Sequence, residues 1–166
     1  MIYLVLAAFL GTLAYSDNVL PNPMFKPEFM SAKWYMFIFI LFKVSFGMAF
    51  EELVFRYVPY KYINKQITNN EKNVDFNLTS ISLIFFILWH LAQGHIGKIR
   101  GTERSKVFLS GIFLLLAAIL GITINSIYMT VLKHYDHEHA ALAGFIFHLF
   151  VVLIWMFGFG GYKIMH

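Results

Sequence analysis

The chain has 166 residues, of which 59% are hydrophobic and only 13% are charged, and its mean hydropathy is +0.66. An ordinary soluble domain has about 25% charged residues, so this composition excludes that class and predicts an integral membrane protein. The formal charge of +4 is spread over short loops between apolar segments, which favours contact with a lipid bilayer and argues against a nucleic-acid partner. The absence of cysteine excludes disulfides, thiolate metal sites and a cysteine nucleophile.

Five apolar segments predict five helices, because a helix needs about 20 apolar residues to cross hydrocarbon. The first segment is short and lacks the basic start and cleavage site of a signal peptide, so we expect a retained helix that is tilted or spans incompletely. Pro21, Pro23 and Pro27 predict a loop before the second helix, and Pro59 predicts the end of that helix. The five segments are residues 2–15, 33–58, 78–95, 107–132 and 140–162.

The connecting segments complete the predicted topology. Residues 60–77 are polar and predict a solvated loop, with Asn77 or Thr79 capping the third helix. Loop charges place the first loop, the third loop and the C-terminus on the cytoplasmic side. We therefore expect an all-α, polytopic transmembrane bundle of about five helices, formed by residues 1–166 as one domain. Such a protein would be a multi-pass component of the plasma membrane or an endomembrane.

Three charged residues lie together near the end of the second apolar segment. An ionisable side chain at membrane depth costs about 2.5–3.5 kcal/mol on insertion scales, so Glu51, Glu52 and Arg56 indicate a functional site. On a helix Glu52 and Arg56 share a face and can pair, whereas Glu51 points about 100° away and remains available as a general base for water. The alternative is that all three lie at the membrane interface and extend toward the headgroups.

Two histidines lie inside other apolar segments, His90 in the third and His148 in the fifth. A lone histidine in a helical bundle is usually a hydrogen-bonded packing residue. Two of them beside an acidic pair supply the nitrogen and oxygen groups that hold a water molecule or a metal ion. His134, His137 and His139 have ligand chemistry but no regular ligand spacing, so we expect them to form a hydrated loop.

The first two of these features resemble motifs of the CPBP intramembrane proteases, also called the Abi or CAAX-protease family, which includes the type II prenyl-protein endopeptidases. The first family motif is a Glu-Glu pair with an arginine four residues beyond the second glutamate, and Glu51, Glu52 and Arg56 match it. The second motif is a phenylalanine followed four residues later by a histidine, which Phe86 and His90 match. The resemblance extends over residues 34–155.

The third family motif is a histidine followed four residues later by Asn or Asp. His148 is the best match, but its partner position holds Val152, whose side chain donates no hydrogen bond. His139 is followed by Ala143 at the same spacing and does not complete the motif either. The chain therefore departs from the family pattern at the residue expected to orient the water or the oxyanion.

The resemblance implies a glutamate-dependent endopeptidase that cleaves a peptide or the C-terminal tail of a lipidated protein inside the bilayer. Glu51 or Glu52, together with His90 and His148, would activate water, and Arg56 would hold the acidic pair. The resemblance leaves the use of a metal open, and Glu51, His90 and His148 offer the donors of a zinc triad. Two alternatives are a catalytically inactive scaffold or immunity-type relative, and a haem protein with His90 and His148 as axial ligands.

Overall fold

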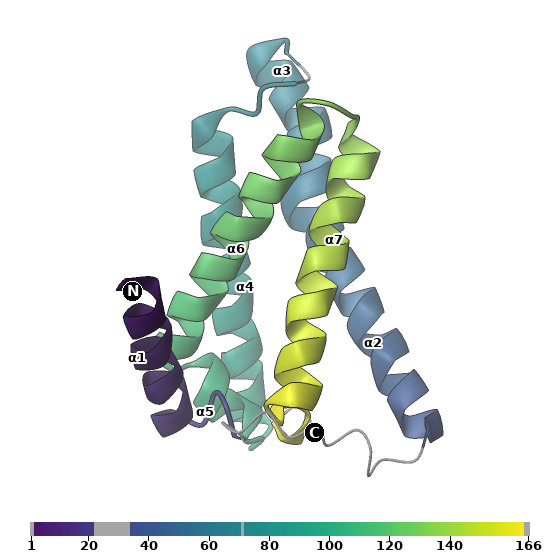
Figure 1. Ribbon diagram of the computed structural model, residues 1–166. Coiled ribbons are helices and arrows are strands. Elements are labelled where there is room, and N and C mark those ends of the chain that lie inside the picture. The colour runs from purple at the N-terminus through teal and green to yellow at the C-terminus, as the bar shows by residue number, and fades with distance from the viewer. Residues whose placement is uncertain (1, 22–33, 71, 165–166) are drawn as a thin grey trace.

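The computed structural model describes residues 2–21, 34–70 and 72–164, and within these ranges the chain is an all-α bundle, as predicted (Figure 1). Pro23 and Pro27 of the expected first loop lie outside the described residues. The longer helices correspond to the five predicted segments, and two short helices lie between them. The helices are α1 Ile2–Ser16, α2 Trp34–Glu52, α3 Asn64–Thr68, α4 Phe76–Ile99, α5 Arg104–Phe108, α6 Gly111–Leu132 and α7 His137–Leu153.

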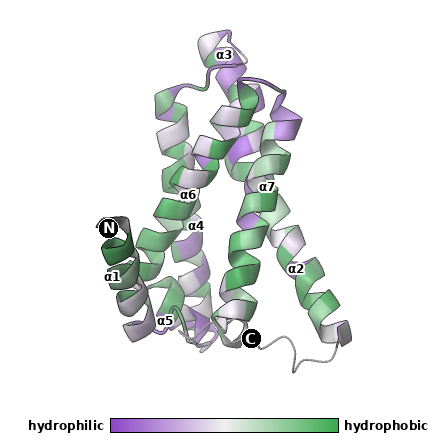
Figure 2. Ribbon diagram, in the orientation of Figure 1, coloured by the Kyte–Doolittle hydropathy of each residue, from purple (hydrophilic) through white to green (hydrophobic). Residues whose placement is uncertain are grey.

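Three helical stretches of the described chain have the length and composition to cross a membrane. They are α4, α6 and the α7 helix prolonged to Gly158. The long helices consist largely of hydrophobic residues (Figure 2). Many of these are exposed, among them Phe42 and Phe46 of α2, which are 73% and 70% exposed. Large apolar groups exposed in this way suit contact with lipid tails. The shorter α1 packs against part of α6, in agreement with an incompletely spanning first helix.

The second helix does not end before Pro59, so that prediction was wrong. The helix widens into π-helical turns at Leu53–Tyr57 and Pro59–Ile63 and continues into α3. Pro59 occupies the first position of its turn, where its missing N–H is tolerated. Tyr60 is fully buried, and its ring packs edge-on against Tyr128 with centroids 5.1 Å apart. Burial of this tyrosine explains why residues 60–68 are helical, whereas residues 69–70 and 72–75 form the mostly exposed connection that the polar composition predicts.

Helix caps explain the other differences from the predicted boundaries. The side chain of Asp75, and not Asn77 or Thr79, caps α4 by accepting a hydrogen bond from the Leu78 N–H. Ser110 caps α6 by accepting from the Phe113 N–H, which separates α6 from the short α5.

The start of the fifth helix also differs from the prediction. Asp136 caps α7, so His137 belongs to the first turn of this helix and not to a hydrated loop. The His137 side chain is buried, and its Nδ1 lies 2.8 Å from the Tyr128 hydroxyl. His139 is exposed and pairs with Asp136.

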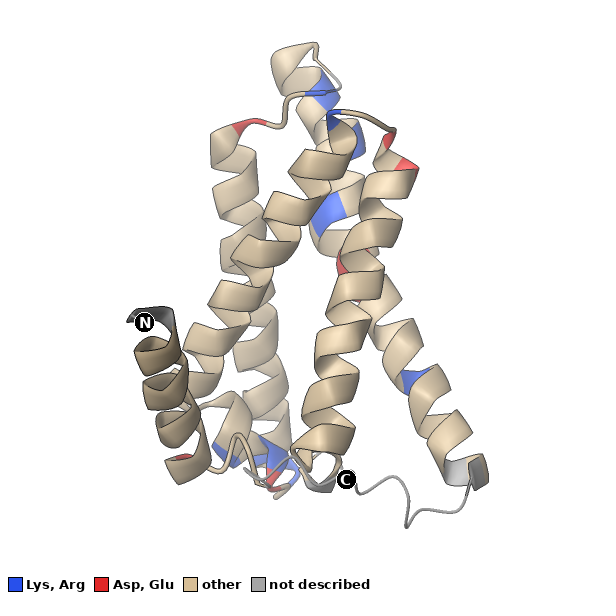
Figure 3. Cartoon of the chain, viewed as in Figure 1, with Lys and Arg blue, Asp and Glu red and all other residues tan. Residues whose placement is uncertain are grey.

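Helix packing brings together α2, α4 and α7, which contain residues of the three motifs. α6 packs against both α4 and α7, and α2 packs against α7 (Figure 1). Apolar clusters fill the two ends of this arrangement, one around Tyr60 and Leu132 and the other around Ile40 and Met156. Most charged residues gather near the ends of the bundle, with few along its middle (Figure 3). The buried charged groups among these belong to the site described next and are Glu51, Glu52 and Arg56.

Candidate active site

The charged cluster of the second helix is buried inside the bundle. Glu51, Glu52 and Arg56 are only 5%, 2% and 1% exposed, so the alternative of side chains extending to the membrane interface is excluded. Glu51 and Glu52 end α2, and Arg56 lies in the π-helical turn that follows. Nη1 of Arg56 lies 2.7 Å from Oε1 of Glu52, as the four-residue spacing predicts. A buried charge needs such a partner, since an unpaired one is strongly destabilising.

Arg56 is also held by α6. Its Nε donates to Oδ1 of Asn125 at 2.8 Å, and its Nη2 approaches the carbonyl oxygen of Gly121 at 3.4 Å. The guanidinium lies over the ring of Phe86, 4.9 Å from its centroid. Asn125 was not predicted as a site residue, although an asparagine in the middle of an otherwise apolar helix is a signal that could have identified it.

His148 of α7 lies between the two carboxylates. Its Nδ1 lies 2.8 Å from Oε1 of Glu52, and because a carboxylate can only accept, Nδ1 carries the proton. Its Nε2 lies 3.9 Å from Oε2 of Glu51, too far for a direct hydrogen bond. One turn earlier, Gly144 makes room for Glu52: a Cβ at this position would lie 3.1 Å from Oε2 of Glu52.

His90 of α4 completes the set of predicted residues. Its Nδ1 lies 2.8 Å from the Phe86 carbonyl oxygen, so Nδ1 donates and Nε2 is the atom available for chemistry. The neighbouring Trp89 donates from Nε1 to Oε1 of Glu51 at 2.9 Å. Oε2 of Glu51 is buried and has no hydrogen-bond partner in the described part of the chain. Oε2 of Glu52 is buried without a partner among the described residues as well, so each glutamate is oriented through Oε1.

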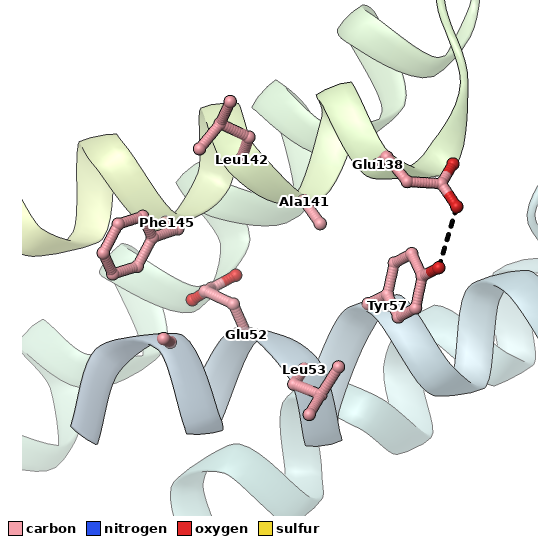
Figure 4. A pocket seen from close by; sticks show the side chains of 8 residues that line it. Glu52, Leu53, Tyr57, Glu138, Ala141, Leu142 and Phe145 are labelled. Atoms are coloured by element: carbon pink, nitrogen blue, oxygen red, sulfur yellow. Dashed lines mark hydrogen bonds between the residues drawn. The ribbon is translucent and has the colours of Figure 1, made fainter. Parts of the chain in front are cut away.

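A cavity of about 400 Å³ brings three of these residues together. Glu51, His90 and His148 line it, and Val152 contributes an apolar side chain to the same wall. Most of the remaining wall is also apolar. Glu52 instead lines a shallower hollow of about 310 Å³ between α2 and α7 (Figure 4). The two carboxylates therefore face different spaces on either side of His148.

The donor geometry gives no support to the zinc-triad hypothesis. Among the described residues, no three His, Asp or Glu side chains converge closely enough to hold a metal ion. The mechanism below therefore uses the side chains of this chain alone.

Fold and site together define an intramembrane helical bundle with a buried glutamate–histidine centre. The model of one protein family matches residues 32–160, and its description is "Type II CAAX prenyl endopeptidase Rce1-like". The chain belongs to this family, which confirms the resemblance seen in its first two motifs. No curated protein and no solved structure matches the chain.

Proposed function

We propose that this protein is an intramembrane endopeptidase in which Glu51 is the general base. The observation that supports this most directly is the convergence of Glu51, His90 and His148 on one cavity inside an apolar bundle. Membership of a CAAX-type endopeptidase family agrees with this role and with a peptide substrate that reaches the site from the bilayer. Peptides and lipidated protein tails are the proposed substrates, and the plasma membrane or an endomembrane is the proposed location.

The gap between Glu51 and His148 suits one water molecule. Their facing atoms, Oε2 and Nε2, are 3.9 Å apart, and a polar contact at this distance is commonly bridged by water. In the proposed step, Glu51 removes a proton from the water while the water oxygen attacks the peptide carbonyl carbon. The tetrahedral intermediate then breaks the C–N bond, and Glu51 returns the proton to the leaving amine.

The histidines and Arg56 have different roles in this proposal. His148 is oriented through Nδ1 by Glu52, whose charge Arg56 in turn balances. His90 is oriented through Nδ1 by a backbone carbonyl, so in its neutral form Nε2 accepts a hydrogen bond from the attacking water.

A second candidate function is that of a catalytically inactive relative that retains the fold as a scaffold. Val152 favours this candidate, because it lines the cavity at the position where the family motif has a hydrogen-bonding side chain. The buried Glu52–Arg56–His148 network would then serve stability alone. Only a measurement of hydrolysis separates the two candidates.

The test compares detergent-purified wild type with Glu51→Gln and with the matched control Glu103→Gln. Farnesylated and unlipidated forms of one C-terminal peptide are incubated with each variant, and products are detected by mass spectrometry. We expect Glu51→Gln to lower the rate by roughly 100-fold to 10,000-fold, the range of general-base catalysis. Glu103 is exposed and pairs with Lys106, so its variant retains activity. Equal rates for all three proteins, or no hydrolysis by any of them, would favour the inactive candidate.

A further inference from the structure

The cavity that holds the proposed catalytic residues also contains a cation at its α5 side. Arg104, the first residue of α5, and Gln93 of α4 both line the cavity with Glu51 and His90. Gln93 lies one helical turn beyond His90, about 4.5 Å of rise along α4. The polar groups of an otherwise apolar cavity are therefore arranged from the proposed base toward the arginine.

The guanidinium of Arg104 is held in place by two contacts. Its Nη2 donates to Oε1 of Gln93, and its plane lies over the ring of Phe108, 4.6 Å from the centroid. A guanidinium has five N–H donors, so one hydrogen bond leaves most of them unused. Nε of Arg104 in particular is buried and has no hydrogen-bond partner among the described residues.

No carboxylate in the described part of the chain forms an ion pair with Arg104. The adjacent Glu103 pairs with Lys106 at 2.8 Å instead. Burial lowers the pKa of the Arg104 guanidinium, and the Glu51 carboxylate opposes that shift. Arginine nevertheless stays protonated in proteins, so the cavity contains a half-buried positive charge that lacks a paired anion.

We propose that Arg104, positioned by Gln93 and Phe108, binds the free carboxylate at the C-terminus of the peptide substrate. The planar guanidinium matches a carboxylate with two parallel N–H···O bonds. A cavity of about 400 Å³ holds a short tail, since sites for drug-sized ligands measure about 300–1,000 Å³. The site would thus favour cleavage of a peptide bond close to the C-terminus of the substrate. This inference rests on the proposed peptidase function.

The test measures binding and requires no turnover. A short apolar peptide with a free C-terminal carboxylate and its C-terminal amide are titrated against detergent-purified wild type, Arg104→Gln and the control Arg100→Gln. Arg100 is an exposed arginine that follows α4 at the same end of the bundle. We expect wild type and Arg100→Gln to bind the acid roughly tenfold to 100-fold more tightly than the amide, as hydrogen bonds to a charged group suggest. Arg104→Gln should bind both forms equally.

The comparison of acid with amide on the wild-type protein keeps the test valid if Arg104→Gln does not fold. Equal affinity of the wild type for the two peptides, or no binding of either, would overturn the carboxylate site. A folded Arg104→Gln variant that still prefers the acid over the amide would also overturn the carboxylate site. These outcomes are distinct from failure of the peptidase proposal, which is absence of hydrolysis that depends on Glu51. A protein that hydrolyses the acid and the amide equally well would retain the function and lose the inference.

Discussion

Nε2 of His148 lies 3.9 Å from Oε2 of Glu51, beyond direct hydrogen-bond range but close enough for one bridging water. The same imidazole contacts the other carboxylate directly, with Nδ1 2.8 Å from Oε1 of Glu52. One histidine thus separates an acid that pairs with Arg56 and His148 from an acid that lines the cavity. The adjacent glutamates are therefore expected to respond differently to substitution.

The first prediction concerns stability. Glu52→Ala removes the carboxylate that pairs with the buried Arg56 and should lower the free energy of unfolding by about 3–5 kcal/mol, as for other broken buried ion pairs. Glu51→Gln keeps an oxygen that accepts from Trp89 and should leave stability nearly unchanged while hydrolysis is lost. Unfolding in detergent, followed by tryptophan fluorescence, gives both values. Similar stability losses in the two variants would contradict this division of roles.

A second prediction concerns Asn125, which accepts a hydrogen bond from Nε of Arg56. Asn125→Leu has similar volume but leaves that buried N–H without its acceptor. The expected cost is about 1.5–3 kcal/mol, the value for hydrogen bonds to charged groups. Ser126→Ala is the control, because the neighbouring Ser126 is exposed and bonds only within its own helix. A variant as stable as this control would show that the stability of the fold does not depend on the Arg56–Asn125 hydrogen bond.

Gly144 provides a third prediction, because it lies where α7 passes the Glu52 carboxylate. The Cβ of Gly144→Ala would lie 3.1 Å from both Oε2 of Glu52 and Cγ2 of Ile124. We expect the carboxylate to shift, which would turn His148 and lower the rate of hydrolysis more than it lowers stability. Gly111→Ala is the control, since a Cβ there meets nothing within 4 Å. Unchanged kinetics in Gly144→Ala would mean that the position of Glu52 is not critical.

A fourth prediction concerns pH. Hydrogen bonds from the backbone and then the side chain of His139 lower the pKa of Asp136, the cap of α7. A carboxyl group whose pKa is lower in the folded state stabilises the protein above its unfolded pKa, about 3.9, and this contribution is lost as pH falls. Wild type should therefore melt at a higher temperature than Asp136→Ala above about pH 5. Melting curves between pH 3 and 6 should converge on acidification, and a constant difference would contradict this assignment.

The apolar segments were sufficient to predict the membrane bundle, because length and hydropathy are local properties of the chain. The pairing of Glu52 with Arg56 also followed from sequence, since a four-residue spacing determines which side chains share a helix face. The predicted end of the second helix was wrong because the prediction considered Pro59 alone and not the packing of the residues next to it. Burial of Tyr60 against α6 outweighs the local signal, and no pattern within the segment shows it.

Contacts made by residues outside the family motifs were not predicted from sequence. Asn125, Gln93 and Arg104 reach the site only because α4, α5 and α6 pack in one particular rotation. Trp89 adjoins a recognised motif, yet only the structure shows its indole N–H pointing at Glu51. Spacing along one helix identifies which residues share a face, whereas contacts between helices depend on packing that a single sequence does not specify.

The final prediction addresses Val152, which lines the cavity one helical turn beyond His148. Val152→Asn places an amide donor at the position where the family motif has Asn or Asp, and oxyanion donors are worth about 100-fold to 1,000-fold in rate. We therefore expect faster hydrolysis of the same C-terminal peptide, with a gain up to that range if the amide reaches the oxyanion. Val151→Asn is the control, because it adds the same group to the cavity about 100° around the helix. A gain in both variants would indicate a general effect of polarity, and a gain in neither would show that position 152 does not limit the reaction in this chain.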